Sequence, residues 1–209
     1  MRIRNNIILY TQRVEIITGY HERRDCADQR IARFLWACGF IPVPVNNLPE
    51  FAEELTGCVH PAGILLTGGN DLAAYGGNAP ERDATERVLL DYAIQRDLPV
   101  LGFCRGMQMI AEYFGNTLQP VKNHVACRHK ITGNMPHKSV NSYHNWGIST
   151  IADPLYALER TEDGIIEAIC HRERKIMGIM WHPEREDPFT KEDIWLFSEF
   201  FKSGKYAVD

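Results

Sequence analysis

The stretch Leu98–Gly115, LPVLGFCRGMQMIAEYFG, decides the fold of this chain. Its first residues form a short apolar run, which is typical of a strand buried on both faces of a parallel sheet. In its second half the apolar residues recur at helical spacing, and Gly115 supplies the stop signal of a helix. The stretch therefore predicts a strand, a sharp turn and a helix, with Cys104 on the turn.

Cys104 lies in the pattern Gly102-Phe103-Cys104-Arg105-Gly106. The two glycines permit a tight turn, and the arrangement has the geometry of a nucleophile elbow in which cysteine replaces serine. The positive end of the helix dipole favours a thiolate at Cys104, and the backbone N–H of Arg105 would point toward an oxyanion formed beside it. Taken alone, the pattern fits a buried structural cysteine equally well.

A second apolar run, Ile176–Trp181, predicts another buried strand, and it ends at His182-Pro183-Glu184. Residues two apart in an extended segment lie on the same side, so Glu184 can orient the imidazole of His182 while its other nitrogen faces a thiol. The sequence therefore predicts a catalytic triad of Cys104, His182 and Glu184. The alternative is a surface histidine beside an acid, which requires two independent strand-end signals to coincide by accident.

The motifs GFCRGMQ, residues 102–108, and WHPE, residues 181–184, resemble the signatures of the class I glutamine amidotransferase-like family. The resemblance extends from about Ile7 to Phe201. It implies an α/β three-layer sandwich with a mostly parallel central sheet, and cleavage of a γ-glutamyl amide through a cysteine thioester, without metal or cofactor. Because arginine follows the cysteine, the chain is similar to the γ-glutamyl hydrolase branch, notably the γ-glutamyl-γ-aminobutyrate hydrolases; ammonia-supplying chains more often carry leucine there.

The same resemblance implies further site residues. The loop after the predicted strand of residues 63–67 matches the family loop that gives the second oxyanion N–H, here Gly69, with Gly68 beside the substrate. Gln108, Ser142 and Tyr143 match positions that contact the glutamyl group in the family. From the residues alone, the glycine pair also suits a simple turn, and Gln108 and Ser142 also suit purely local hydrogen bonding.

The leaving group is suggested by the N-terminal region of residues 12–30 and by VNSYHNWGI, residues 140–148. Both resemble a bacterial subgroup, the γ-glutamyl-CDP-amidate hydrolases, which release glutamate and a cytidine diphosphoramidate used in capsule decoration. A pyrophosphate in such a nucleotide-linked substrate needs positive charge. Exposed basic side chains are more often simply solvated, and a γ-glutamyl-polyamine type of substrate would instead favour an acidic pocket mouth. The candidate contacts are Arg13, Arg23, Arg24, Arg128 and Lys130.

Two other functional classes fit the same motifs. A glutaminase subunit that passes ammonia to a synthetase would carry an exposed apolar docking patch, which the sequence does not mark. A non-catalytic binding protein on the same fold would be expected to lack one of the three triad residues, and all three are present. Hydrolysis is therefore the favoured class.

The composition is that of an ordinary globular protein. The chain has 209 residues, a net charge of −4 and 44% hydrophobic residues, which predicts one domain, residues 1–209, without a nucleic-acid-binding surface. Its six cysteines lack C-x-x-C spacing and no secretory h-region is visible, so we expect reduced thiols and a cytoplasmic location. The apolar run of residues 7–10 is too short for a membrane span. The oligomeric state is not indicated.

The remaining elements follow from periodicity and end signals. The region Lys122–His144 is the least periodic, and we expect it to be a loop that lines the site. It contains His124, Cys127 and His129, but a metal site is disfavoured because no fourth ligand stands at regular spacing. Strands are predicted at residues 6–11, 41–45 and 63–67, a hairpin at 165–171 and 175–181, and helices at 29–38, 49–55, 83–96 (with Asp83 as N-cap) and from Thr190.

Overall fold

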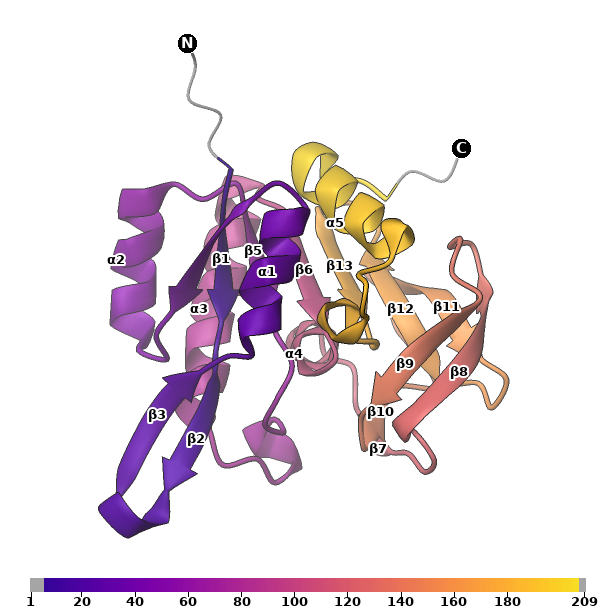
Figure 1. Ribbon diagram of the computed structural model, residues 1–209, viewed down its shortest axis with the longest axis horizontal. Helices are drawn as coiled ribbons and strands as arrows, with labels where there is room; N and C mark the ends of the chain where they lie inside the picture. Colours follow the sequence, from indigo (N-terminus) through magenta and orange to yellow (C-terminus); the bar gives the residue numbers. More distant parts are fainter. Residues whose placement is uncertain (1–5, 207–209) are drawn as a thin grey trace.

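Short apolar segments alternate with amphipathic helices along the chain, and this alternation builds a layered α/β structure. The computed structural model describes residues 6–206 and arranges them around a nine-stranded sheet of order β4-β1-β5-β6-β13-β12-β11-β8-β9 (Figure 1). In chain order, the strands of this sheet are β1 (Ile7–Thr11), β4 (Ile41–Val45), β5 (Gly63–Leu66), β6 (Val100–Phe103), β8 (Val125–Gly133), β9 (Ser139–Tyr143), β11 (Leu155–Thr161), β12 (Ile166–His171) and β13 (Ile176–Ile179).

One half of the sheet is parallel and contains β4, β1, β5, β6 and β13. Strands β5, β6 and β13 are buried along their whole length, which explains their continuous apolar sequences. Strand β4, which contains Pro42 and Pro44, occupies the edge, where a missing N–H is tolerated. Because parallel strands end at the same edge of a sheet, the segments after β5, β6 and β13 bring Gly68, Cys104 and His182 together.

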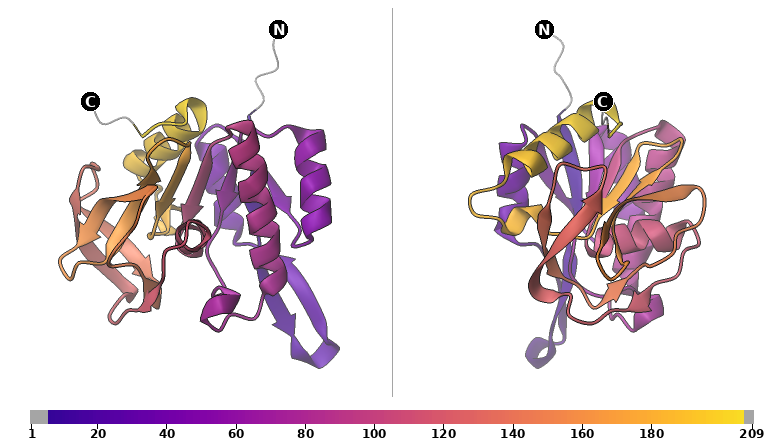
Figure 2. Two further views of the ribbon diagram at one scale, coloured as in Figure 1. Left: turned by 180° about the vertical axis from the view of Figure 1, so that it is seen from behind. Right: turned by 90° about the vertical axis from the view of Figure 1, so that its right-hand side faces the viewer.

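Helices cover both faces of the sheet and divide the core into two clusters (Figure 2). One face is covered by α1 (Gln29–Ala37) and α5 (Lys191–Ser203), and the other by α2 (Pro49–Val59), α3 (Pro80–Arg96) and α4 (Arg105–Tyr113). The predicted three-layer α/β fold is thereby confirmed. Between residues 6 and 206, no helix combines the length and apolarity that crossing a membrane requires.

The other half of the sheet is antiparallel, so the sheet as a whole is mixed. The predicted hairpin is confirmed as β12 and β13. The region Lys122–His144 is not a loop, because β8 and β9 pair antiparallel within it and end the sheet. Most residues of β8 are exposed or half-buried, which leaves no apolar alternation to read in the sequence.

The polar segment of residues 19–30 also forms more structure than its composition suggests. Strands β2 (Arg13–Ile17) and β3 (Glu22–Cys26) pair antiparallel in a hairpin that projects from the body of the molecule (Figure 1). The remaining short elements are the paired strands β7 (Gln119–Pro120) and β10 (Trp146–Gly147) and the 3₁₀ helices Thr18–Tyr20, Ala73–Tyr75 and Pro183–Arg185.

Helix α3 begins earlier than predicted. Its first residue is Pro80 and its N-cap is Ala79, so the expected N-cap at Asp83 is wrong. Proline at the first helical position loses no hydrogen bond there and presets the helical φ, which makes Pro80 the true start signal. Asp83 lies one turn inside the helix and forms an ion pair with Arg105.

Candidate active site

Cys104 stands at the junction of β6 and α4 in a strained backbone conformation, with φ 51° and ψ −111°. The backbone around Cys104 is packed so closely at the two flanking glycines that neither has room for a side chain. A Cβ atom on Gly106 would lie 2.1 Å from the carbonyl oxygen of Leu66, and one on Gly102 would lie 2.5 Å from the backbone of Gly106. Only glycine fits at either position, so the predicted elbow follows directly from the G-x-C-x-G pattern.

His182 follows β13, and its Nδ1 lies 2.8 Å from Oε1 of Glu184 in the adjoining 3₁₀ helix. Both side chains are almost fully buried. Burial opposes a charge on His182, but the neighbouring Cys104 and Glu184 outweigh it and raise the pKa of His182 to about 9. The imidazole is therefore held in its protonated form near neutral pH.

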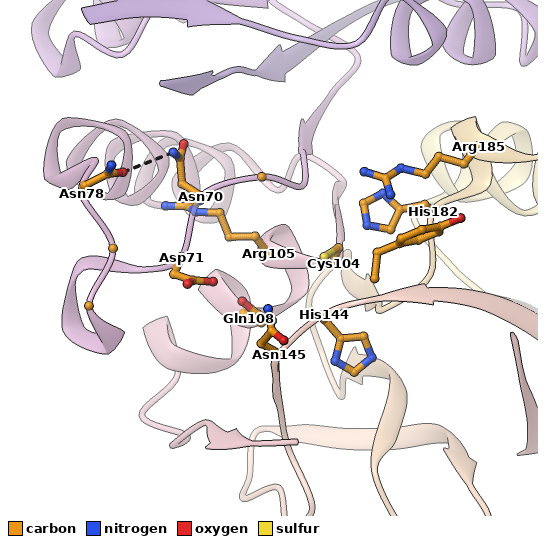
Figure 3. A pocket seen from close by; sticks show the side chains of 14 residues that line it. Asn70, Asp71, Asn78, Cys104, Arg105, Gln108, His144, Asn145, His182 and Arg185 are labelled. Carbon is orange, nitrogen blue, oxygen red and sulfur yellow. Dashed lines mark hydrogen bonds between the residues drawn. The ribbon is translucent and has the colours of Figure 1, made fainter. Parts of the chain in front are cut away.

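Cys104 and His182 meet on either side of Gly68. A Cβ atom on Gly68 would lie 2.9 Å from Cε1 of His182 and 3.6 Å from Cβ of Cys104, so glycine is what allows this approach. Within residues 6–206, Nε2 of His182 has no hydrogen-bond partner. The nitrogen not used by Glu184 is thus left for the thiol or for a substrate (Figure 3).

A cavity of about 510 Å³ opens over these two residues. Figure 3 shows Cys104 in the middle of the lining residues, with His182 and Arg185 to one side of it and Gln108 beside Asn145 on another. Its lining is mostly polar, which suits a charged small molecule better than an apolar one. The other lining residues are Gly69, Asn70, Asp71, Gly76, Gly77, Asn78, Arg105, Tyr143, His144 and Arg185.

The loop after β5 is fixed by hydrogen bonds from a side chain of α3. Arg82 donates to the carbonyl oxygens of Thr67, at 2.6 Å, and of Gly69. Arg82 also donates to Glu86 at 2.9 Å, and Glu86 in turn forms an ion pair with Arg105. Burial raises the pKa of the Glu86 carboxyl, but the charges of Arg105 and Arg82 outweigh it and bring that pKa below its usual value.

Sequence and structure comparisons place this geometry in a known family. The model of the glutamine amidotransferase class-I family matches residues 25–202. The chain belongs to the class-I glutamine amidotransferase family. It is a hydrolase of the glutamine amidotransferase type.

Relatives of this amidotransferase chain include a γ-glutamyl hydrolase and a GMP synthase. It is 33% identical over 199 residues to the γ-glutamyl-CDP-amidate hydrolase of Campylobacter jejuni, covering 91% of this chain and 95% of that protein. It is 29% identical to the glutamine-hydrolysing GMP synthase of Prochlorococcus marinus, covering 74% of this chain but 29% of that protein. A solved glutamine amidotransferase of Thermotoga maritima, 16% identical, has the same fold, with a TM-score of 0.66 over 95% of this chain and 85% of that one.

Of the residues predicted to contact the substrate, some line the cavity and others do not. Gln108 and Tyr143 line the cavity. The hydroxyl of Ser142 donates to the carbonyl oxygen of His124 at 2.7 Å, and Ser142 is buried beside Tyr143 and is not among the residues that line the cavity. Gly69 has a φ of 86° and lies against Arg13, which confirms that the loop needs glycine there.

The predicted leaving-group arginines do not gather in the cavity. Arg13 packs against Gly69, pairs with Glu15 at 3.3 Å and lines a smaller pocket that also touches His182. Arg24 pairs with Glu22 on the projecting hairpin and is not among the residues that line the main cavity or the smaller pocket beside it. Arg23 pairs with Glu81, and Arg128 pairs with Glu186 at 2.7 Å and, with Lys130, borders a separate cavity.

Sequence reasoning missed Arg185, which lines the main cavity. Its guanidinium lies 4.2 Å from the ring centre of Tyr143, a cation–π contact. Its position directly after WHPE was the available signal. It also missed Arg82 and Glu86, whose roles depend on contacts with residues far away in the sequence.

Proposed function

We propose that this chain hydrolyses a γ-glutamyl amide to glutamate and a free amine, with Cys104 as nucleophile, His182 as acid and base, and Glu184 as the group that orients His182. The proposal rests above all on one observation: Glu184 engages one nitrogen of His182 at 2.8 Å, while the other nitrogen is unpartnered next to the elbow cysteine. An imidazolium beside a thiol favours the thiolate, which is the attacking form.

The chemistry has two steps. The thiolate of Cys104 attacks the γ-carbonyl carbon, and the C–N bond breaks as His182 gives its proton to the leaving nitrogen. Water then attacks the γ-glutamyl thioester and passes a proton to His182, which frees glutamate and restores the thiolate. The N–H groups of Arg105 and Gly69 are the proposed oxyanion donors, each worth about 3–4 kcal/mol of barrier in comparable enzymes.

The glutamyl group is assigned to the cavity wall that Gln108 and Tyr143 line, next to Ser142. Gln108 is fixed because its Nε2 donates to the carbonyl oxygen of Trp146 at 2.9 Å, which leaves its amide oxygen for the substrate ammonium. Backbone groups at Ser142 and Tyr143 are proposed to meet the α-carboxylate. The side chain of Ser142 has no direct part in this scheme, because its hydroxyl already bonds His124.

For the leaving group we propose a cytidine diphosphoramidate, so that the substrate is γ-glutamyl-CDP-amidate. The likeness to the Campylobacter jejuni hydrolase over nearly the full length of both proteins supports this choice. Arg185 lines the cavity and Arg13 packs against the cavity-lining Gly69, and these two cations are proposed to contact the pyrophosphate. The product would then serve capsule decoration, and the reaction would take place in the cytoplasm.

Two alternatives remain for the amine. A γ-glutamyl-γ-aminobutyrate type of hydrolase would use the same triad with a smaller, singly charged leaving group. A glutaminase subunit would release ammonia for a synthetase, and the similarity to part of a glutamine-hydrolysing GMP synthase is the observation in its favour.

Glutamate release by the purified chain separates these functions. We expect fast turnover of γ-glutamyl-CDP-amidate, slower turnover of γ-glutamyl-γ-aminobutyrate and glutamine, and loss of all activity in Cys104→Ala. Cys58→Ala, at an exposed cysteine, is the matched control and keeps full activity. Silence on both amides with weak glutaminase activity would overturn the hydrolase proposal and point to a synthetase partner. Activity that survives Cys104→Ala would overturn the proposed nucleophile.

A further inference from the structure

Three histidines and one glutamate converge behind the wall of the main cavity. His124 precedes β8, His129 lies within it, His144 follows β9, and Glu167 belongs to β12. One ligand atom from each of the four residues can be chosen so that all lie within 4.8 Å of one another. The sequence concealed this cluster, because His144 and Glu167 lie far along the chain from the first two histidines and at no regular spacing.

The hydrogen bonds around the cluster direct lone pairs toward its centre. His144 Nδ1 lies 2.9 Å from the carbonyl oxygen of Trp146, and His124 Nε2 lies 3.0 Å from Oδ2 of Asp163. Both partners are acceptors, so each of these ring nitrogens carries the proton. In the neutral imidazoles the opposite nitrogens, Nδ1 of His124 and Nε2 of His144, are then bare, and they face each other at 3.3 Å.

Glu167 brings a third acceptor to the same point. Its Oε1 lies 3.4 Å from Nε2 of His144 and 3.7 Å from Nδ1 of His124. The side chain is completely buried, and within residues 6–206 neither carboxylate oxygen accepts a hydrogen bond. A buried, unsatisfied carboxylate facing two bare nitrogens is unfavourable unless a cation lies between them.

The separations are those of a tetrahedral metal site. Ligand atoms about 2.0–2.2 Å from a four-coordinate zinc ion lie about 3.3–3.5 Å from one another. The three distances of 3.3, 3.4 and 3.7 Å therefore require little movement to enclose such an ion. His129, whose ring centre lies 4.1 Å from that of His124, is in position to close the fourth corner.

We propose that His124, His129, His144 and Glu167 bind one divalent transition metal ion, with Zn²⁺ as the ion that suits three imidazoles and a carboxylate. Four protein ligands leave no open position, so the site is structural. Asp163 and the carbonyl oxygen of Trp146 orient two of the ligands from outside, as the outer partners of metal-bound histidines do. A cavity of about 410 Å³, bordered by His124 and His129, gives the ion a path from solvent.

The ion would connect the sheet extension to the substrate wall. It joins β8 and β12 to the residue after β9, and His144 also lines the main cavity. The carbonyl oxygen of Trp146 lies within hydrogen-bond distance of both His144, at 2.9 Å, and Gln108, at 2.9 Å. Metal at His144 therefore fixes the position of Gln108 through one shared carbonyl group.

Metal content and Co²⁺ binding of the tag-free chain test the proposal. The work is done in a Cys104→Ala background, because the Cys104–His182 pair is a second place where Zn²⁺ could bind. We expect one Zn²⁺ per chain, removed by a chelator and restored by one equivalent. Co²⁺ in its place should give the strong visible absorption of a four-coordinate ion, and added Zn²⁺ should raise the melting temperature of the apoprotein.

Variants then locate the ion. Glu167→Gln and His124→Gln should lose stoichiometric binding, and Asp163→Asn should bind about 10- to 100-fold more weakly. His137→Gln removes another buried histidine paired with a carboxylate and should bind like its parent. The parent chain alone decides the matter if a variant fails to fold. The proposed metal site would be overturned if the parent chain did not bind Zn²⁺ stoichiometrically, or if Glu167→Gln bound it as well as the parent. The four side chains would then form a hydrogen-bond network without a metal ion.

Discussion

The side-chain amide of Asn141 forms hydrogen bonds with both the backbone N–H and the backbone carbonyl oxygen of His182. The N–H of His182 donates to Oδ1 of Asn141 at 2.8 Å, and Nδ2 of Asn141 donates to the carbonyl oxygen of His182 at 2.8 Å. The same Nδ2 also donates to Glu186 at 2.9 Å. A residue of β9 therefore sets where the imidazole stands over Cys104, although it lies far from the WHPE motif in the sequence.

Replacing Asn141 by alanine should lower kcat about 100-fold, because a shift of about 1 Å in a catalytic group costs that much. KM should change much less, since the cavity wall is kept. Asn141→Asp retains the acceptor for the N–H of His182 and should recover part of the loss. Steady-state kinetics of both variants measure this split. An equal rise of KM, or a melting temperature far below that of the parent, would show instead that Asn141 supports the fold.

The proposed acid role of His182 predicts an upper pH limit for activity. Burial lowers the pKa of His182, but Cys104 and Glu184 together raise it to about 9. The protonated form therefore persists through neutral pH and is lost as the pH rises through about 9, so kcat/KM should fall above that value. NMR titration of labelled histidine follows the same proton directly.

Removing Glu184 should move that limit downward. Glu184→Gln keeps the shape of the side chain but removes the charge that favours the imidazolium, so both the NMR titration and the upper limb of the pH profile should shift to lower pH. His171 is the internal reference, because burial lowers its pKa and it lies outside the cavity. If the fall of kcat/KM at high pH stayed at the same pH in Glu184→Gln, that fall would report a group other than His182.

The buried pair of Glu86 and Arg105 should matter most for stability. Glu86→Ala removes the buried carboxylate that Arg82 and Arg105 share and leaves Asp83 as the one remaining ion-pair partner of Arg105 among the described residues. It should cost about 3–5 kcal/mol of unfolding free energy. Because the pKa of Glu86 is lowered in the folded state, its contribution is present above about pH 4.5 and is lost as the pH falls below it. Denaturation across acid pH tests this.

The control for this prediction is an ion pair at the surface. Glu22→Ala breaks the exposed pair with Arg24 and should change the unfolding free energy by less than about 1 kcal/mol. Similar losses from Glu86→Ala and Glu22→Ala would contradict the stabilising role assigned to the buried network.

Local sequence patterns predicted the parts of the site that depend on local geometry. The glycines of the elbow and the order of WHPE each determine a turn at a strand end, and the parallel sheet brings those ends together. Asn141, Arg82 and Glu86 act through long-range contacts, which leave no periodic signal. Strand β8, which lies next to the edge strand β9, was hidden because it buries few residues and so shows no apolar alternation. Pro80 was readable as a start signal and was overlooked in favour of Asp83.

Gly106 should tolerate no side chain. A Cβ atom there would lie 2.1 Å from the carbonyl oxygen of Leu66, which belongs to the neighbouring strand and cannot move aside. Gly106→Ala should therefore cost at least about 2 kcal/mol or prevent folding. Gly57→Ala in α2 meets no atom within 4 Å and should stabilise the chain by about 0.5–1 kcal/mol. Chemical denaturation of both variants checks the elbow geometry independently of activity. Equal stability of the two variants would contradict it.

Arg185 should separate the substrates if the leaving group carries a pyrophosphate. A charge-assisted hydrogen bond contributes about 1.5–3 kcal/mol, so Arg185→Ala should lower kcat/KM for γ-glutamyl-CDP-amidate about 10- to 100-fold. Activity on γ-glutamyl-γ-aminobutyrate should change little, since that amine has no phosphate. Arg185→Lys keeps the charge but not the planar contact with Tyr143, and it should recover only part of the loss.

The matched control is Arg24→Ala, because Arg24 lies on the projecting hairpin and pairs with Glu22. It should leave the kinetics with both substrates unchanged. An equal loss with both substrates in Arg185→Ala would show that Arg185 acts on the triad, since its Nε lies 3.7 Å from Oε1 of Glu184. A loss confined to the nucleotide-linked substrate is the result that only a phosphate contact explains, because the triad serves both reactions alike.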